Sequence, residues 1–217
     1  MSTAYRDGIH FHKIPYRSIR TFIKKQIACG VSTFNDLHPT YVQGMGLQRY
    51  QIHEDSFHVP VPREEVWNHY LTADPNLAWN GKIINFALML SKSDGKIMYR
   101  HDQYSGAKVG QVFYLNLSIL GLLHIGVAHQ IIGIDHDSYF FELSYVEGSE
   151  SRGKQRISFH ATSIKSTKIV HTTHYRSDSS FRDRYVYPYF HDKAIHEYHE
   201  NMERSLIKGT SSSLGSA

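Results

Sequence analysis

The chain of 217 residues lacks the features that define several common classes of protein. Its one cysteine, Cys29, cannot form an internal disulfide, which excludes a disulfide-stapled fold and is typical of a reducing compartment. No apolar stretch follows Met1, so we expect no secretory signal and a cytoplasmic protein. The sequence also contains no nucleophile elbow, zinc-protease motif or kinase signature, so no motif indicates an enzyme class.

Charged residues are missing from the middle of the chain. No Asp, Glu, Lys or Arg occurs between Lys108 and Asp135, a span long enough for a membrane helix. We favour two buried strands joined near Gly121, because the span contains asparagine, histidine and glutamine and because its apolar residues alternate.

What is present indicates a folded protein with a basic N-terminal segment. Apolar residues make up 41% of the chain and charged residues 20%, which excludes a disordered chain. The net charge of +4 comes from the first 50 residues, and residues 18–28 predict a helix with Ile19, Phe22 and Ile23 on its apolar face. We favour packing of this face on the main domain, with peripheral contact to an anionic membrane as the alternative. Because no second basic patch follows, we expect no nucleic-acid partner.

The rest of the sequence predicts a strand, one or two helices, a series of strands and a long helix. Residues 48–59 predict the first strand, and Pro62 followed by an acidic pair predicts a helix that starts at Arg63. Residues 83–90 fit either a helix or a strand. Residues 183–207 predict the closing helix and residues 208–217 a flexible tail. Six further strands are predicted at 96–104, 108–119, 123–135, 138–147, 154–164 and 167–177.

This order of elements predicts the fold class. A series of consecutive strands forms a sheet whose apolar face needs a cover, and only the closing helix is long enough to provide one. We therefore predict an α+β protein in which a curved antiparallel sheet of about seven strands wraps around the C-terminal helix. Residues 1–46 would form a helical N-terminal extension. A cavity is expected between the sheet and the helix, and such cavities commonly bind apolar ligands.

One stretch resembles a known family. Residues 59–67, Val-Pro-Val-Pro-Arg-Glu-Glu-Val-Trp, resemble the junction of first strand and first helix in the START and Bet v 1-like superfamily, which includes the polyketide cyclase-like proteins. Trp79 lies where the family often has a tryptophan, and residues 140–145 and 153–159 resemble its central hairpin. The resemblance covers about residues 47–207. It implies a helix-grip fold with a deep cavity for a lipid, a polyketide-like metabolite or another hydrophobic or aromatic small molecule. The family includes carriers, receptors and enzymes, so the function depends on the lining.

Histidine is unusually frequent, with 16 copies, and strand alternation indicates which copies point inward. An imidazole in an apolar cleft can move a proton near neutral pH, and a tyrosine can stabilise an enolate. We predict these acid–base roles for His101, His129, His171 and Tyr175. The opposite register of the last strand stays open, and a buried histidine can equally be structural. The predicted ligand-binding residues are Trp79, Tyr99, Phe113, Leu115, Val127, Phe141, Tyr145, Phe159, His191, Ile195 and Tyr198.

Metal binding is a second use for histidine. His196 and His199 are three residues apart on the closing helix and are followed by Glu200 and Glu203, so one helix face offers two ligands. We expect neither a metal nor a cofactor, because no cysteine pair or recognised ligand spacing accompanies them. A solvated helix face with i,i+4 pairs is the simpler interpretation.

Three functions are compatible with the sequence. A non-enzymatic binder or carrier of a hydrophobic small molecule predicts a mainly apolar cavity. A cyclase-like or aromatase-like enzyme, acting as a lyase or isomerase on a keto or phenolic substrate, predicts at least two titratable groups that converge. A membrane-associated accessory protein predicts an exposed apolar face on the N-terminal helix. We favour the binder because the sequence reveals no acid–base constellation.

Overall fold

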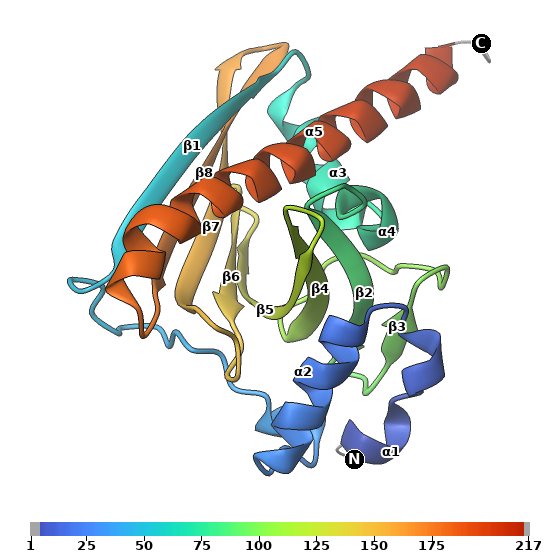
Figure 1. The fold of residues 1–217 in the computed structure, drawn as a ribbon. Helices are drawn as coiled ribbons and strands as arrows, with labels where there is room; N and C mark the ends of the chain where they lie inside the picture. Colours follow the sequence, from blue (N-terminus) through green and yellow to red (C-terminus); the bar gives the residue numbers. More distant parts are fainter. Residues whose placement is uncertain (1–4, 215–217) are drawn as a thin grey trace.

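The computed structural model describes residues 5–214 and contains one eight-stranded antiparallel sheet (Figure 1). The strands lie in the order β1-β8-β7-β6-β5-β4-β2-β3. Strands β4 to β8 therefore form a meander of neighbours in sequence, and β1 pairs with β8 at one edge. The strands are β1 Gln51–Val59, β2 Ile84–Ser91, β3 Ile97–Tyr99, β4 Gln111–Ile119, β5 Leu123–Asp135, β6 Phe140–Tyr145, β7 Arg152–Ser163 and β8 Ser166–Arg176.

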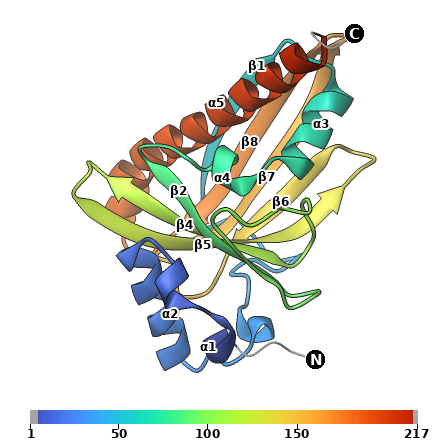
Figure 2. The same cartoon turned by 90° about the vertical axis from the view of Figure 1, so that its right-hand side faces the viewer.

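Helices cover both faces of the sheet. The long α5 crosses one face, and the N-terminal helices α1 and α2 lie against the other (Figures 1 and 2). Within the described residues, no helix is long and apolar enough to cross a membrane. The helices are α1 Tyr5–Gly8, the 3₁₀ turns η1 Phe11–Lys13 and η2 Phe34–Asp36, α2 Arg17–Ala28, α3 Arg63–Thr72, α4 Pro75–Ala78, the π-helix η3 Arg182–Val186 and α5 Tyr187–Leu214.

Strand β2 occupies the segment that the sequence left open between helix and strand. Its residues are buried on both faces, apart from the partly buried Asn85. A strand that is covered on both sides has a continuous apolar run, which hides the alternation that identifies a half-buried strand. The sheet consequently has eight strands and not about seven.

Two predicted boundaries differ from the structure. The strand predicted at 96–104 is confined to β3, because the chain turns after Tyr99 and His101 has a positive φ of 75°. Residues 208–214, predicted as tail, continue α5 as far as Leu214, since extending an existing helix by one residue costs little. Residues 1–4 and 215–217 lie outside the described residues.

The N-terminal extension packs on the face of the sheet that α5 does not cover. Ile19, Phe22 and Ile23 of α2 are buried in a second hydrophobic core that includes Tyr114 and Ala128 from the sheet. Close approach is possible because β5 has a glycine at position 126, where a Cβ atom would lie 3.0 Å from the Cβ of Phe22. The favoured packing of α2 on the main domain is thus observed, and its apolar face is covered.

This packing predicts that α2 contributes to global stability. The change Ile23→Ala removes a fully buried side chain and should lower the free energy of unfolding by about 2–5 kcal/mol. Lys24→Ala, on the exposed face of the same helix, should change it by less than about 0.5 kcal/mol. Urea denaturation of the full chain measures both, and equal effects of the two substitutions would mean that α2 is not docked.

Candidate functional site

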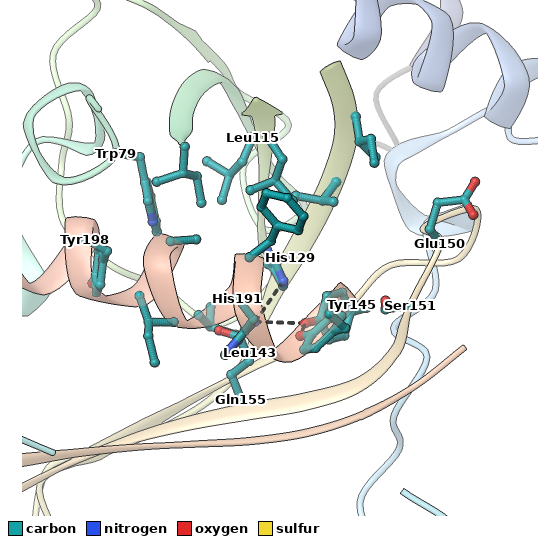
Figure 3. Close-up of a pocket in the computed structure, with 18 of the residues that line it drawn as sticks. Trp79, Leu115, His129, Leu143, Tyr145, Glu150, Ser151, Gln155, His191 and Tyr198 are labelled. Atoms are coloured by element: carbon teal, nitrogen blue, oxygen red, sulfur yellow. Dashed lines mark hydrogen bonds between the residues drawn. The ribbon is translucent and has the colours of Figure 1, made fainter. Parts of the chain in front are cut away.

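A cavity of about 150 Å³ lies between the sheet and the first half of α5 (Figure 3). Strands β2, β4, β5, β6, β7 and β8 supply one wall, and η3 and α5 supply the other. Most of the lining is apolar, but one end is polar. The apolar part is formed by Trp79, Ile84, Leu115, Leu117, Ile119, Ile125, Val127, Leu143, Ile157, Val186, Phe190, Ala194 and Ile195.

The polar end is built by strand register. His129 on β5 lies directly opposite Tyr145 on β6, and on β8 His171 is diagonal to Gln155 of β7, whose direct partner is Thr173. Side chains at such cross-strand positions are close enough to interact. The sheet therefore brings together polar residues that are far apart in the sequence and points them at one end of the cavity.

The side-chain amide of Gln155 joins these residues. Its Nε2 donates to Nε2 of His129 at 3.1 Å and to the Tyr145 hydroxyl at 3.2 Å (Figure 3). Its Oε1 accepts from Nε2 of His171 at 3.0 Å. The Tyr145 hydroxyl is in turn hydrogen-bonded to the hydroxyl of Tyr187 at the start of α5.

The hydrogen-bond chain continues from the cavity into the core. With Nε2 of His171 protonated, its Nδ1 accepts from Nε2 of His199 at 3.0 Å. Nδ1 of His199 then accepts from the Tyr70 hydroxyl at 2.7 Å. Each neutral imidazole thus donates one hydrogen bond and accepts one, so Gln155 fixes the tautomers of both rings.

Burial keeps these groups uncharged. Desolvation lowers the pKa of His129 from its ordinary value near 6.5 to about 4 and that of His199 to about 3. The pKa of His171 is also lowered well below its usual value, mainly by desolvation. Burial raises the pKa of Tyr145 to about 12. At neutral pH the polar end therefore offers hydrogen bonds without net charge.

His129 has one hydrogen-bonding atom left for a ligand. Its Nε2 accepts from Gln155, so in the neutral ring the proton lies on Nδ1. This Nδ1 has no hydrogen-bond partner among residues 5–214. A carbonyl or hydroxyl oxygen of a molecule in the cavity could accept from it.

Charge is confined to the rim of the cavity. Glu150 and Arg182 line its edge and form an ion pair at 2.7 Å. The turn that follows the lining residue Ile119 carries exposed leucines at positions 120, 122 and 123. Exposed apolar surface therefore lies next in the chain to a residue of the cavity wall.

Comparisons with known proteins identify the fold and no closer relationship. No protein-family model and no curated protein matches the chain. Norcoclaurine synthase from Thalictrum flavum, solved in complex with dopamine and hydroxybenzaldehyde, has a TM-score of 0.56 and 12% identity over 77% of this chain and 95% of its own.

Two further solved structures agree with this result. Ara h 8.0201 has a TM-score of 0.51 and 15% identity over 73% of this chain and 99% of its own. A conserved protein from Geobacillus kaustophilus has a TM-score of 0.52 and 14% identity over 73% of this chain and 96% of its own. The chain therefore has the same helix-grip fold as these solved structures.

Many of the residues predicted from strand and helix alternation line the helix-grip cavity. The inward register expected for the last strand is observed, because Ile169, His171, Thr173 and Tyr175 are all buried. The predicted residues found in the lining are Trp79, Leu115, Val127, His129, Tyr145, His171, His191, Ile195 and Tyr198.

Other predicted residues lie outside this lining. Phe113 and Phe141 line a smaller adjacent cavity of about 30 Å³. Phe159 is core and packs its ring against Trp67 and Tyr70. Tyr175 is buried beneath Tyr187, with ring centroids 3.8 Å apart, and its hydroxyl donates to the backbone carbonyl of Asp183. Because this hydroxyl is already hydrogen-bonded to the backbone and does not face the cavity, it is not available to a ligand there.

The predictions that His101 and Tyr99 face the cavity are wrong. His101 follows the end of β3 and is exposed in a turn. Tyr99 is buried, but on the opposite face of the sheet, where its hydroxyl accepts from the backbone N–H of His10 at 2.7 Å. Alternation finds the buried faces of a strand but cannot tell which of two covered faces holds a cavity.

Three residues of the hydrogen-bond network, Gln155, His199 and Tyr187, were not predicted as site residues from the sequence. Gln155 has the same strand parity as Ile157 and Phe159, so alternation did carry a signal for it. His199 was assigned to a solvated or metal-binding face, but it is buried, whereas His196 is only partly buried and contacts Asp55 at 2.7 Å. Tyr187 starts α5 directly after a π-helical turn, a distortion that helical periodicity does not predict.

The neutral histidines predict acid sensitivity. Between pH 6.5 and 4 the unfolded chain binds a proton at His129 that the folded chain does not bind, so the free energy of unfolding falls as the pH falls through this range. His129 alone would account for about 3 kcal/mol, and His199 adds a change of the same sign.

Urea denaturation at pH 7.5, 6 and 5 measures this dependence. His129→Phe should make it less steep, because the other buried histidines still contribute, whereas His58→Gln, which removes an exposed histidine of β1, should leave it unchanged. A free energy of unfolding that is constant between pH 7 and pH 5 would contradict neutral burial of these rings.

Proposed function

We propose that the protein binds a small, uncharged hydrophobic or aromatic molecule that carries a hydrogen-bond acceptor. The observation that carries this proposal is a cavity with an apolar body and one neutral polar end. Apolar walls supply affinity by removing ligand surface from water, while a few placed polar groups supply orientation. The Nδ1–H of His129 is the donor that would bind the ligand's oxygen.

The volume of the cavity supports a ligand with at least one ring. Its 150 Å³ equals the volume of an engineered apolar cavity that admits benzene. The solved complex of norcoclaurine synthase with dopamine and hydroxybenzaldehyde gives a second reason, since a protein with the same fold accommodates compounds that each have one aromatic ring. We therefore favour a single-ring aromatic ketone, aldehyde or phenol over a long-chain lipid.

The protonation states favour binding over catalysis. A general base or acid is most effective when its pKa is near the working pH. The pKa of His129 is about 4 and that of Tyr145 is about 12, so at pH 7 one is a weak base and the other a weak acid. In addition, the one carboxylate of the lining, Glu150, is at the rim and paired with Arg182.

A cyclase-like or isomerase-like enzyme is the second candidate. His129 and Tyr145 converge on one end of the cavity and are linked through the Gln155 amide, as acid–base chemistry on a keto or phenolic compound requires. For this function, a bound substrate would have to bring one of the two pKa values closer to neutral.

Binding can be tested with two single-ring probes of similar size, acetophenone and ethylbenzene, of which only the first has a hydrogen-bond acceptor. The wild-type protein should bind acetophenone about five- to tenfold more tightly, because one hydrogen bond contributes about 1 kcal/mol. His129→Phe should abolish this preference and leave ethylbenzene binding unchanged. NMR titration of the Trp79 indole signal measures the affinities, with Trp67, which does not line the cavity, as the internal reference.

A cavity-filling pair of variants serves as the control. Leu117→Trp places an indole in the cavity and should abolish binding of both probes, whereas Ile164→Trp, in the exposed β7–β8 turn, should not. If neither probe shifts the Trp79 signal at millimolar concentration, the protein does not bind molecules of this class in the cavity.

The same ketone separates a binder from an enzyme. An enzyme that enolises its ligand would catalyse exchange of the acetophenone methyl hydrogens with D₂O, and His129→Phe would abolish the exchange. We expect no protein-dependent exchange at pH 7, because the neutral His129 is a weak base. Proton NMR of the methyl signal measures the rate, and catalysed exchange by the wild type would favour the enzyme.

A further inference from the structure

Four side chains converge outside the cavity, where the edge strand β1 meets α5. His53 and Asp55 point towards α5, because in the β1–β8 pairing they lie opposite the buried Thr173 and His171. From α5, Asp192 and His196 are one helical turn apart and project towards β1. Two imidazoles and two carboxylates from two elements thus lie together.

The distances within this cluster are those of a ligand set. His196 Nε2 lies 2.7 Å from Asp55 Oδ2 and 3.6 Å from Asp192 Oδ1, and His53 Nε2 lies 3.8 Å from the same oxygen of Asp192. One donor atom each from Asp55, Asp192 and His196 fits within 4.8 Å of the others. Around a tetrahedral ion with bonds of about 2.1 Å, donor atoms are about 3.4 Å apart, so the closest pair would have to separate and the wider pairs would have to approach one another.

The other nitrogen of His53 also has a hydrogen-bond partner, the imidazole of His191. A metal-binding histidine usually donates its second N–H to a neighbouring acceptor, which fixes the tautomer and the orientation. Nδ1 of His53 lies 3.3 Å from Nδ1 of His191, whose Nε2 contacts the Thr173 hydroxyl at 3.2 Å. With its proton on Nδ1, His53 would present the free pair of Nε2 to the side of Asp192.

We propose that His53, Asp55, Asp192 and His196 form a binding site for a divalent first-row transition ion of the zinc type. Mixed nitrogen and oxygen donors suit Zn²⁺, whereas Mg²⁺ and Ca²⁺ prefer oxygen donors alone. No metal was expected from the sequence, because no cysteine pair or recognised ligand spacing is present. Of the four side chains, Asp192 and His196 are an i,i+4 pair on α5, whereas His53 and Asp55 come from a strand about 140 positions earlier in the chain.

An ion at this position would cross-link the edge strand β1 to the helix α5. His53 would link the ion to His191, which lines the cavity. Because the unfolded chain does not hold these four ligands together, bound ion would stabilise the folded state according to its concentration and affinity. The proposal does not depend on which molecule occupies the cavity.

Calorimetric titration of ZnCl₂ into the full chain, tag-free and stripped with EDTA, tests the site at pH 7.5. We expect one ion per chain and a higher melting temperature with zinc than without it. Asp192→Asn and His196→Gln should each weaken zinc binding at least tenfold. Both side chains are only partly buried, so both variants should keep the melting temperature of the stripped wild type to within a few degrees.

Matched controls lie on the same strand. Glu54→Gln and His58→Gln remove a carboxylate and an imidazole from the exposed face of β1 and should leave zinc affinity unchanged. Substituting MgCl₂ for ZnCl₂ should give no binding. The proposal is overturned if the wild type binds no stoichiometric zinc at micromolar concentration. It is equally overturned if Asp192→Asn and His196→Gln bind zinc as tightly as the wild type, because the ion would then be held by other histidines.

Discussion

The side-chain amide of Gln155 sets the direction of the hydrogen bonds made by the histidines at the polar end of the cavity. Its oxygen requires a proton on Nε2 of His171, and this proton determines the tautomers of His171 and His199 as far as the Tyr70 hydroxyl. Its nitrogen requires the free electron pair of His129 to face it, which leaves the Nδ1 proton of His129 for a ligand. One neutral group with a donor at one end and an acceptor at the other can do this, whereas a carboxylate or an ammonium cannot.

The absence of charge from this network follows from its surroundings. An ionised group in an apolar interior costs several kcal/mol unless a counter-ion accompanies it, and among residues 5–214 the charged side chains of the lining, Glu150 and Arg182, lie at the rim and not in the interior. A neutral imidazole donates one hydrogen bond and accepts another. Successive rings can therefore form a chain of hydrogen bonds in which no buried polar atom lacks a partner and no ring is charged. The abundance of histidine thus has a structural explanation at the polar end, and the same property makes the network sensitive to acid.

Alternation predicted the fold and part of the site, and its failures have a common cause. It found His129 and His171 because β5 and β8 are regular and their inward faces are distinctly buried. It misplaced Tyr99 because the N-terminal extension covers the second face of the sheet, so that burial no longer marks the cavity side. Contacts between β1 and α5 join residues about 140 positions apart, such as Asp55 and His196, and no local pattern contains that information.

The two faces of the sheet are covered in different ways. On one face, α2 packs closely enough that Gly126 has no room for a side chain, so the sheet is held against a continuous core. On the other, α5 spans the sheet and leaves a cavity beneath its first half, while Tyr198 and Met202 pack into the core farther along. The face covered by α2 is thus closed by direct packing, whereas the face covered by α5 keeps room for a ligand beneath the start of that helix.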